Sequence, residues 1–176
     1  MPRMNIYHDR NSPAAARVTL SRMKNVVGHV PSLAGVLAGA PGVLDACTNF
    51  LQHFMAGSLD KQECLLVILV ASREFDNEYC YELAADTALK GKFPAHLLKA
   101  VEKRRTLRKK TYRALAAFVE AVIREGGEIR DEELDALRKV GYSEQQVLEI
   151  ITGISVAWIW SNVSGVAGLA AGMDST

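Results

Sequence analysis

The fold of this chain is decided by the stretch Cys64-Leu65-Leu66-Val67-Ile68-Leu69-Val70-Ala71. Every position in it is apolar, whereas a helix on the surface of a protein carries apolar residues on one face only. A segment that is apolar all round must be covered on every side. We therefore predict that the helix containing this stretch, from Asp60 to about Arg73, lies in the middle of the protein.

Helical patterns continue on both sides of this segment. Apolar residues recur at helical spacing nearly everywhere, and no alternating run with Asn-Gly or Asp-Gly turns predicts a hairpin. We predict an all-α, single-domain helical bundle over residues 1–176. The expected helices cover 13–25, 32–39, 42–56, 60–73, 77–90, a segment that Pro94 begins, 131–139, and a long last helix after a capping box of Ser143 and Gln146. The helix over 77–90 has Asn77 or Asp76 as its expected N-cap and Gly91 as its expected end.

Residues 150–173 form an uncharged segment of 24 residues. About 20 apolar residues suffice to span a bilayer, so a membrane helix is one interpretation. Polar and small residues interrupt the segment, however, and no basic cluster follows to orient an insertion. The interruptions are Thr152, Ser155, Ser161, Asn162 and Ser164, with glycines at 153, 165, 168 and 172. We expect a helix that is buried or contacts another subunit, and no membrane.

Composition and charge exclude several classes of protein. Apolar residues make up 49% of the chain and charged residues 23%, which is unlike a disordered chain. The 21 Lys and Arg face 20 Asp and Glu, so no overall field attracts nucleic acid or anionic membranes. Cys47, Cys64 and Cys80 lack the close spacing of a zinc site or a disulfide scaffold, and the first ten residues lack the apolar core of a secretory signal. We expect reduced thiols, a cytoplasmic location, and no metal or other cofactor.

A local basic run interrupts this charge balance. Between Lys99 and Arg113 there are eight Lys and Arg residues and one acid, Glu102. Clustered cations can bind an anion or nucleic acid. Tyr112 is the only aromatic residue in the run and no nucleic-acid-binding motif frames it, so a solvated helix corner is the simpler interpretation. We predict no nucleic-acid partner, and a charged feature that could attract an acidic substrate.

Two consecutive helices carry a resemblance to a known family. They read Leu59-Asp60-Lys61-Gln62-Glu63-Cys64-Leu65-Leu66-Val67-Ile68-Leu69-Val70-Ala71-Ser72 and Asn77-Glu78-Tyr79-Cys80-Tyr81-Glu82-Leu83-Ala84-Ala85-Asp86-Thr87-Ala88-Leu89. The pair resembles the core of the carboxymuconolactone decarboxylase and alkylhydroperoxidase D-like family. Other segments resemble it in the same order, namely 28–33, 131–134 and 141–150, and Asn162 stands where members often carry an Asn. The resemblance covers about residues 25–170 and implies an all-α fold and a homo-oligomer.

The chain departs from the active-site motif of that family. Peroxidatic members carry Cys-x-x-Cys followed four residues later by His, and these positions fall on Asn77, Cys80 and Ala84. Their two thiols form a disulfide while an acid and the imidazole relay protons. Decarboxylase-like members carry Tyr-Glu-Trp and a later His, which fall on residues 79, 80, 81 and again 84. The resemblance therefore implies a degenerate motif in which Cys80 remains but the second thiol and the histidine are absent.

Helix geometry sorts the candidate catalytic residues into two stripes. Positions three or four apart share a face, so Cys80 lies on a largely apolar stripe, and Glu82 and Asp86 lie on a charged one. We expect that the two stripes do not face the same pocket. Cys80 is either a lone redox thiol or a packing residue, and the two acids are either an acid and base pair or part of a solvated surface.

Glu63 is the candidate for the relay acid of the family. That acid lies near the start of the central helix, where the gapless register places Leu65 and leaves Glu63 two residues early. A two-residue insertion in the break before Asn77 would bring Glu63 into register. The alternative is an ordinary glutamate in the first turn, which the helix dipole favours.

Three functions are compatible with these residues. The first is alkylhydroperoxidase-like, thiol-dependent peroxide reduction by an antioxidant oxidoreductase with an altered site and an external thiol reductant. The second is a decarboxylase-like proton transfer on a small carboxylated lactone, in which Glu82 and Asp86 raise each other's proton affinity. The third is a non-catalytic member of the family that binds a small molecule or a partner.

Overall fold

The computed structural model describes residues 1–8 and 11–174, which contain helices and no strand. A short 3₁₀ turn, η1 (Ala14–Ala16), comes first. The α-helices are α1 (Arg17–Val27), α2 (Ser32–Leu37), α3 (Pro41–Met55), α4 (Lys61–Glu74), α5 (Glu78–Lys90), α6 (Ala95–Glu102), α7 (Lys110–Arg124), α8 (Asp131–Lys139) and α9 (Glu144–Ala167). The all-α prediction is confirmed, and the first expected helix begins as the 3₁₀ turn.

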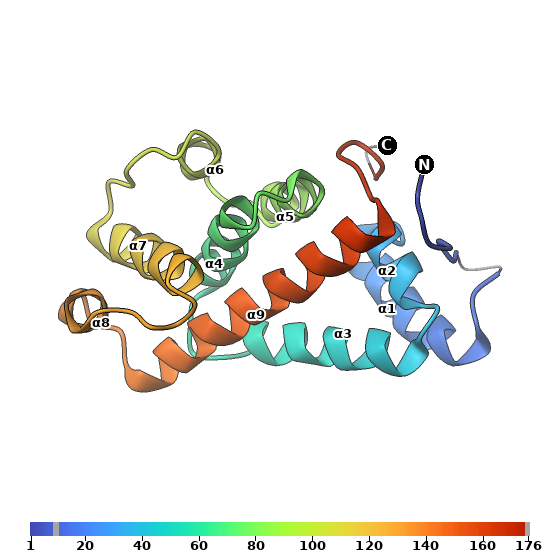
Figure 1. Cartoon of the computed structure of the whole chain (residues 1–176), viewed down its shortest axis with the longest axis horizontal. Helices are drawn as coiled ribbons and strands as arrows, with labels where there is room; N and C mark the ends of the chain where they lie inside the picture. Colours follow the sequence, from blue (N-terminus) through green and yellow to red (C-terminus); the bar gives the residue numbers. More distant parts are fainter. Residues whose placement is uncertain (9–10, 175–176) are drawn as a thin grey trace.

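α4 is the central helix, as its apolar sequence predicts. Residues 64–72 are all buried, and α4 contacts α5, α6, α7 and α9. Figure 1 shows α4 and α5 in the middle, with α6, α7 and α8 at one end of the molecule and α1 and α2 at the other. The long helix α9 crosses the molecule beside α3 (Figure 1). Burial on every side of α4 is therefore achieved by helices from both halves of the chain.

Buried side chains form two clusters. The larger one surrounds α4 and takes side chains from α5, α6, α7 and α9. The smaller one joins η1, α1, α2 and α3 to the first turn of α5, where it includes Tyr79 and Cys80. Trp160 of α9 packs against both clusters. The start of α5 therefore lies where the two clusters meet.

The helix ends follow the capping signals at three predicted positions, and the basic run contains one more. Asn77 is the N-cap of α5, Gly91 follows its last residue, and Ser143 forms the capping box of α9. The break between α6 and α7 lies within the basic run, where the sequence favours a helix corner. Arg104 has a φ of 48°, in the left-handed region, and the N–H of Arg105 bonds the C=O of Ala100, so α6 ends there. The basic run is thus a helix end, a loop and a helix start.

α9 is buried on one side and exposed on the other. A Cβ atom at Gly153 would lie 2.6 Å from the Phe54 ring and 2.8 Å from Val67, so only glycine allows α9 to approach α3 and α4 this closely. By length and composition alone, α9 is able to cross a membrane. It packs against α2, α3, α4, α5 and α7, as the core helix of a folded domain does. Its other face exposes Leu148 and Trp158.

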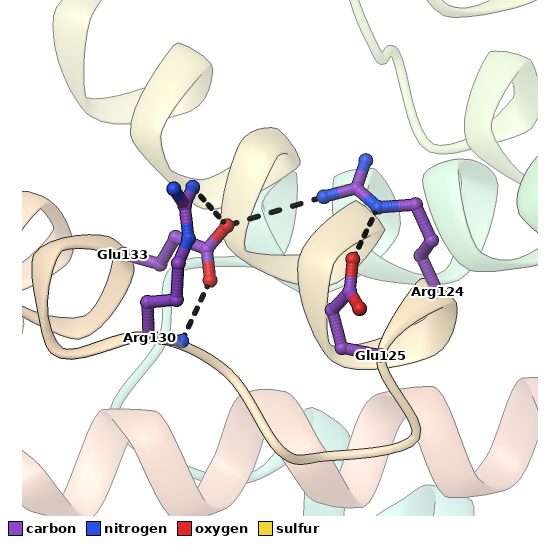
Figure 2. A network of polar contacts seen from close by, with 4 residues as sticks. All are labelled: Arg124, Glu125, Arg130 and Glu133. Carbon is purple, nitrogen blue, oxygen red and sulfur yellow. Dashed lines mark hydrogen bonds and ion pairs between the residues drawn. The ribbon is translucent and has the colours of Figure 1, made fainter.

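The connection between α7 and α8 is held by charged side chains. Figure 2 shows Glu133 between Arg130, 3.0 Å away, and Arg124, 3.9 Å away, with Glu125 paired to Arg124 at 2.7 Å. Glu133 also accepts a hydrogen bond from the backbone N–H of Arg130, which closes the first turn of α8. Exposed ion pairs of this kind contribute little to stability, so they orient the loop more than they hold the fold.

Candidate functional site

Cys80 lies in the first turn of α5, and Asn77 fixes that turn. The Asn77 side-chain oxygen accepts a hydrogen bond from the Cys80 N–H at 2.9 Å, as an N-cap residue does. The Cys80 side chain is 1% exposed and packs in the smaller cluster with residues of α2 and α3. The Cys80 thiol therefore lies at the positive end of a helix, but it is covered by other side chains.

Two serines of α9 supply the polar surroundings of this thiol. The Cys80 Sγ lies 3.4 Å from the Ser164 Oγ. The Asn77 Nδ2 donates to that same Oγ at 2.9 Å and to the Ser161 carbonyl oxygen at 3.0 Å. Because Ser164 donates its one hydroxyl proton to the Ser161 carbonyl at 3.1 Å, it is placed to accept a bond from the Cys80 S–H.

The Ser161 hydroxyl is the unusual group beside Cys80. Its Oγ is buried and has no hydrogen-bond partner of good geometry among the described residues. Burial raises the pKa of the Cys80 thiol, and the hydroxyls of Ser164 and Ser161 act in the opposite direction without cancelling that effect. A buried donor without a partner costs free energy in the resting state, and it remains available to a state of the site that offers an acceptor. A thiolate or an oxidised sulfur at Cys80 would be such a state.

The structure does not bring Glu63 to Cys80. Glu63 lies in the first turn of α4, whereas Cys80 lies in the first turn of α5, the helix that follows the last turn of α4. The Glu63 carboxylate closes a capping box with Asp60 and accepts a bond from the Tyr142 hydroxyl at 2.7 Å. Leu65, in the gapless register of the relay acid, is buried in the larger cluster. Glu63 thus takes the local role of a first-turn glutamate.

Glu82 and Asp86 do come together, on the next face of α5. They line a cavity of about 10 Å³ with His29, Tyr79 and Asp174, and Cys80 is not among its lining residues. A space of this size holds about one water molecule. The Glu82 Oε2 accepts a bond from the Gly172 N–H at 2.6 Å, while Asp86 is exposed. The two stripes of α5 therefore face different surroundings, as the helix geometry indicates.

His29, which precedes α2 and lies outside the family motif, also lines this cavity. The His29 Nε2 is buried and has no hydrogen-bond partner within the described residues. Tyr79 donates to the Asp174 Oδ2 at 2.6 Å and accepts from the Leu33 N–H at 2.9 Å. Burial and the Asp174 carboxylate raise the pKa of Tyr79 well above its usual range. The cavity thus gathers an imidazole, a phenol, three carboxylates and the amino group of Lys90.

Other predicted residues have ordinary surroundings. Asn162 is exposed and donates to the Trp158 carbonyl oxygen of its own helix at 2.8 Å, so it does not reach Cys80. Ser161 and Ser164 reach it instead, and sequence reasoning identified them only as polar interruptions of an apolar segment. In residues 1–8 and 11–174, no three His, Cys, Asp or Glu side chains are arranged to hold a metal ion.

Comparison with known proteins identifies the fold. No family model matches the chain, and no curated protein matches it significantly. A cysteine-to-alanine variant of the debrominase Bmp8 in complex with 2,3,4-tribromopyrrole superposes with a TM-score of 0.83 at 16% identity, over 96% of this chain and 91% of that one. The AhpD core of an uncharacterized peroxidase-related protein from Ralstonia eutropha JMP134 gives 0.82 at 19%, over 96% and 91%.

A third solved structure agrees with these two. An uncharacterized peroxidase-related protein from Silicibacter sp. TM1040 superposes with a TM-score of 0.78 at 18% identity, over 96% of this chain and 93% of that one. The chain therefore has the alkylhydroperoxidase AhpD-like fold, as the sequence resemblance implied. At these identities the likeness defines the fold alone, so the activity has to be argued from the residues around Cys80 and His29.

Proposed function

We propose that the protein is a thiol-dependent oxidoreductase of the AhpD-like type in which Cys80 is the single redox thiol. The observation that carries this proposal is the hydroxyl surroundings of the Cys80 sulfur: the Ser164 Oγ lies 3.4 Å from it, and the buried Ser161 hydroxyl, which has no hydrogen-bond partner of good geometry among the described residues, acts to lower the pKa of the thiol. A hydroxyl in that place can donate to a thiolate or to an oxidised sulfur, and both are better acceptors than a thiol. The position of Cys80 in the first turn of α5 adds the positive end of a helix.

The chemistry balances with an external thiol. Cys80–SH and ROOH give Cys80–SOH and ROH, so the sulfur is oxidised by two electrons while the O–O bond breaks. A small thiol then gives a mixed disulfide and water, and a second thiol releases Cys80–SH and a small disulfide. Asn77 stands where a resolving cysteine would be, and Cys47 and Cys64 form no disulfide with Cys80. A reducing, cytoplasmic location would supply the external thiol.

Turnover is expected to be slow at neutral pH. Burial raises the pKa of the Cys80 thiol, so its thiolate fraction at pH 7 is smaller than that of an exposed cysteine. The oxidation rate should therefore rise about tenfold per pH unit between about pH 7 and 9, because the thiolate is the nucleophile. A rate that is independent of pH over this range would contradict thiolate attack.

The proposal is tested by limited hydrogen peroxide treatment, trapping of sulfenic acid, and mass spectrometry of all three cysteines. We expect Cys80 to be oxidised first, and Ser161→Ala to slow this step about tenfold or more, as loss of a hydrogen bond to a charged group does. Ser155→Ala is the matched control, because Ser155 donates to its own helix on the outer side of α9. Oxidation that begins at Cys47 or Cys64, or no oxidation at all, would refute the proposal.

A second candidate function is proton transfer on a small carboxylated lactone. The observation that favours it is the buried His29 Nε2 in the cavity that Glu82 and Asp86 line, since an imidazole beside carboxylates can relay protons. Glu82→Gln, Asp86→Asn and His29→Gln should each abolish lactone turnover while circular dichroism stays unchanged. Unchanged turnover in all three would exclude this function, and failure of both candidates would leave a non-catalytic binding protein.

A further inference from the structure

The basic run of the sequence forms part of a cavity that the redox proposal does not use. The cavity has a volume of about 250 Å³ and lies between the end of α4, the end of α6, the following loop and α7. Its apolar lining includes Val101, Leu107 and Ala116, which belong to the larger core cluster. Cys80 does not line it. The space is close to the lower end of the range of small-molecule sites, about 300 Å³.

Two of the four arginines that line this cavity are already neutralised. Arg104 pairs with Glu74 and donates to the Arg73 carbonyl oxygen at 3.0 Å. Arg73 pairs with Glu78 at 2.9 Å, and its guanidinium lies 5.2 Å from the Tyr81 ring centre. These contacts hold the two side chains in place. They also leave the Arg73 Nε buried without a hydrogen-bond partner in the described part of the chain.

The other two arginines of the lining are Arg105 and Arg113. Neither forms an ion pair with any residue that the structure describes, and both are exposed. Glu120 is the remaining acid of the lining, and burial together with the nearby Glu74 raises its pKa. The site therefore combines apolar side chains, the guanidinium groups of Arg105 and Arg113, the Glu74 carboxylate, which is paired with Arg104, and the carboxyl group of Glu120. A monoanion fits this balance better than a dianion, which Glu74 and Glu120 would repel.

We infer that this cavity binds a small organic monocarboxylate with an apolar body. Arg105 and Arg113 would pair with the carboxylate, because guanidinium groups recognise it through paired hydrogen bonds. The alkyl or aromatic body would lie against Leu107 and Ala116. The inference does not depend on the activity of Cys80, since no residue of that site lines the cavity.

Isothermal titration of the whole chain with acetate, benzoate and octanoate tests this inference. We expect benzoate or octanoate to bind at least about tenfold more tightly than acetate, because only they fill the apolar space. The neutral isostere benzamide should bind at least about tenfold more weakly than benzoate, because it cannot pair with the guanidinium groups. Inorganic phosphate should bind no better than acetate.

Three variants locate the binding. Arg113→Gln should weaken benzoate or octanoate binding about tenfold or more, whereas Arg108→Gln removes an equal charge from the basic run outside the cavity and should have little effect. Ala117→Leu fills the cavity at an exposed helix position without changing the charge, and should abolish binding. Equal losses in Arg113→Gln and Arg108→Gln, binding unchanged in Ala117→Leu, or no carboxylate binding at millimolar concentration would each overturn the inference.

Discussion

Replacing Asn77 by cysteine should restore the disulfide chemistry that the chain lacks. Asn77 is the N-cap of α5 and Cys80 is three residues later, so the two side chains share one face of the first turn. A Cys-x-x-Cys pair in this position forms reversible disulfides in redox proteins. Once Cys80 is oxidised to a sulfenic acid, the thiol introduced at position 77 would displace water and close the disulfide without an external thiol.

The cost of this change follows from three hydrogen bonds of Asn77. Its side-chain oxygen accepts from the Cys80 N–H, and its amide donates to the Ser161 carbonyl and the Ser164 hydroxyl. Loss of the N-cap costs about 1 kcal/mol, and loss of the two amide bonds costs about 1 kcal/mol each. We therefore expect Asn77→Cys to lower the free energy of unfolding by about 2–3 kcal/mol. Most domains tolerate this, since they unfold at about 5–15 kcal/mol.

The assay counts the free thiols in denaturant after treatment with one equivalent of hydrogen peroxide. Urea unfolding of the reduced proteins measures the change in stability separately. The wild type should lose one thiol of three, and Asn77→Cys two of four. Asn77→Ser is the control, because serine keeps an N-cap oxygen and adds no thiol; it should lose less stability than Asn77→Cys and still consume one thiol. If Asn77→Cys also consumed only one thiol per peroxide, position 77 would not be adjacent to the reactive sulfur and the proposed site would be wrong.

Three further predictions concern stability and assembly. The fold raises the pKa of Tyr79 and keeps its phenol neutral, so Tyr79 contributes fully to the free energy of unfolding below about pH 10, and this contribution falls as the pH rises. The urea midpoint of the wild type should therefore drop more between about pH 9 and 11 than that of Tyr79→Phe. Hydrogen bonds from Ser58, Gln145 and Leu59 outweigh the effect of burial and hold the pKa of Glu149 below its usual range. The contribution of Glu149 to the free energy of unfolding is therefore present above about pH 4.5 and lost as the pH falls. Urea unfolding should show that Glu149→Gln lowers this free energy by about 1–3 kcal/mol at pH 7 and by much less in acid. Leu148, Trp158 and Val166 of α9 are 66%, 54% and 65% exposed, so we expect two or more copies to associate through this face; light scattering should give a multiple of the monomer mass for the wild type and the monomer mass for Trp158→Glu, and a monomeric wild type would exclude this interface.

Local signals in the sequence determined the helices of this protein. Asn77, Gly91 and Ser143 cap helices through bonds to residues a few positions away, and the apolar segment around Val67 requires burial whatever surrounds it. The two stripes of α5 also follow from the sequence, because helical spacing alone separates Cys80 from Glu82. The helix corner in the basic run agrees with the sequence, but the residue at which α6 ends was not predicted, since consecutive cations and an arginine at positive φ carry no capping signature.

Only the tertiary structure decided which side chains meet. Ser164 reaches Cys80 across 84 residues of sequence, and Asp174 reaches Tyr79 across 95. These contacts depend on the angle and depth at which α9 crosses the bundle, which the close approach at Gly153 permits. Helical periodicity fixes the face on which a side chain lies but not the helix that covers that face. For this reason Cys80 could be proposed from the sequence, whereas its contact with Ser164 follows from the packing of α9.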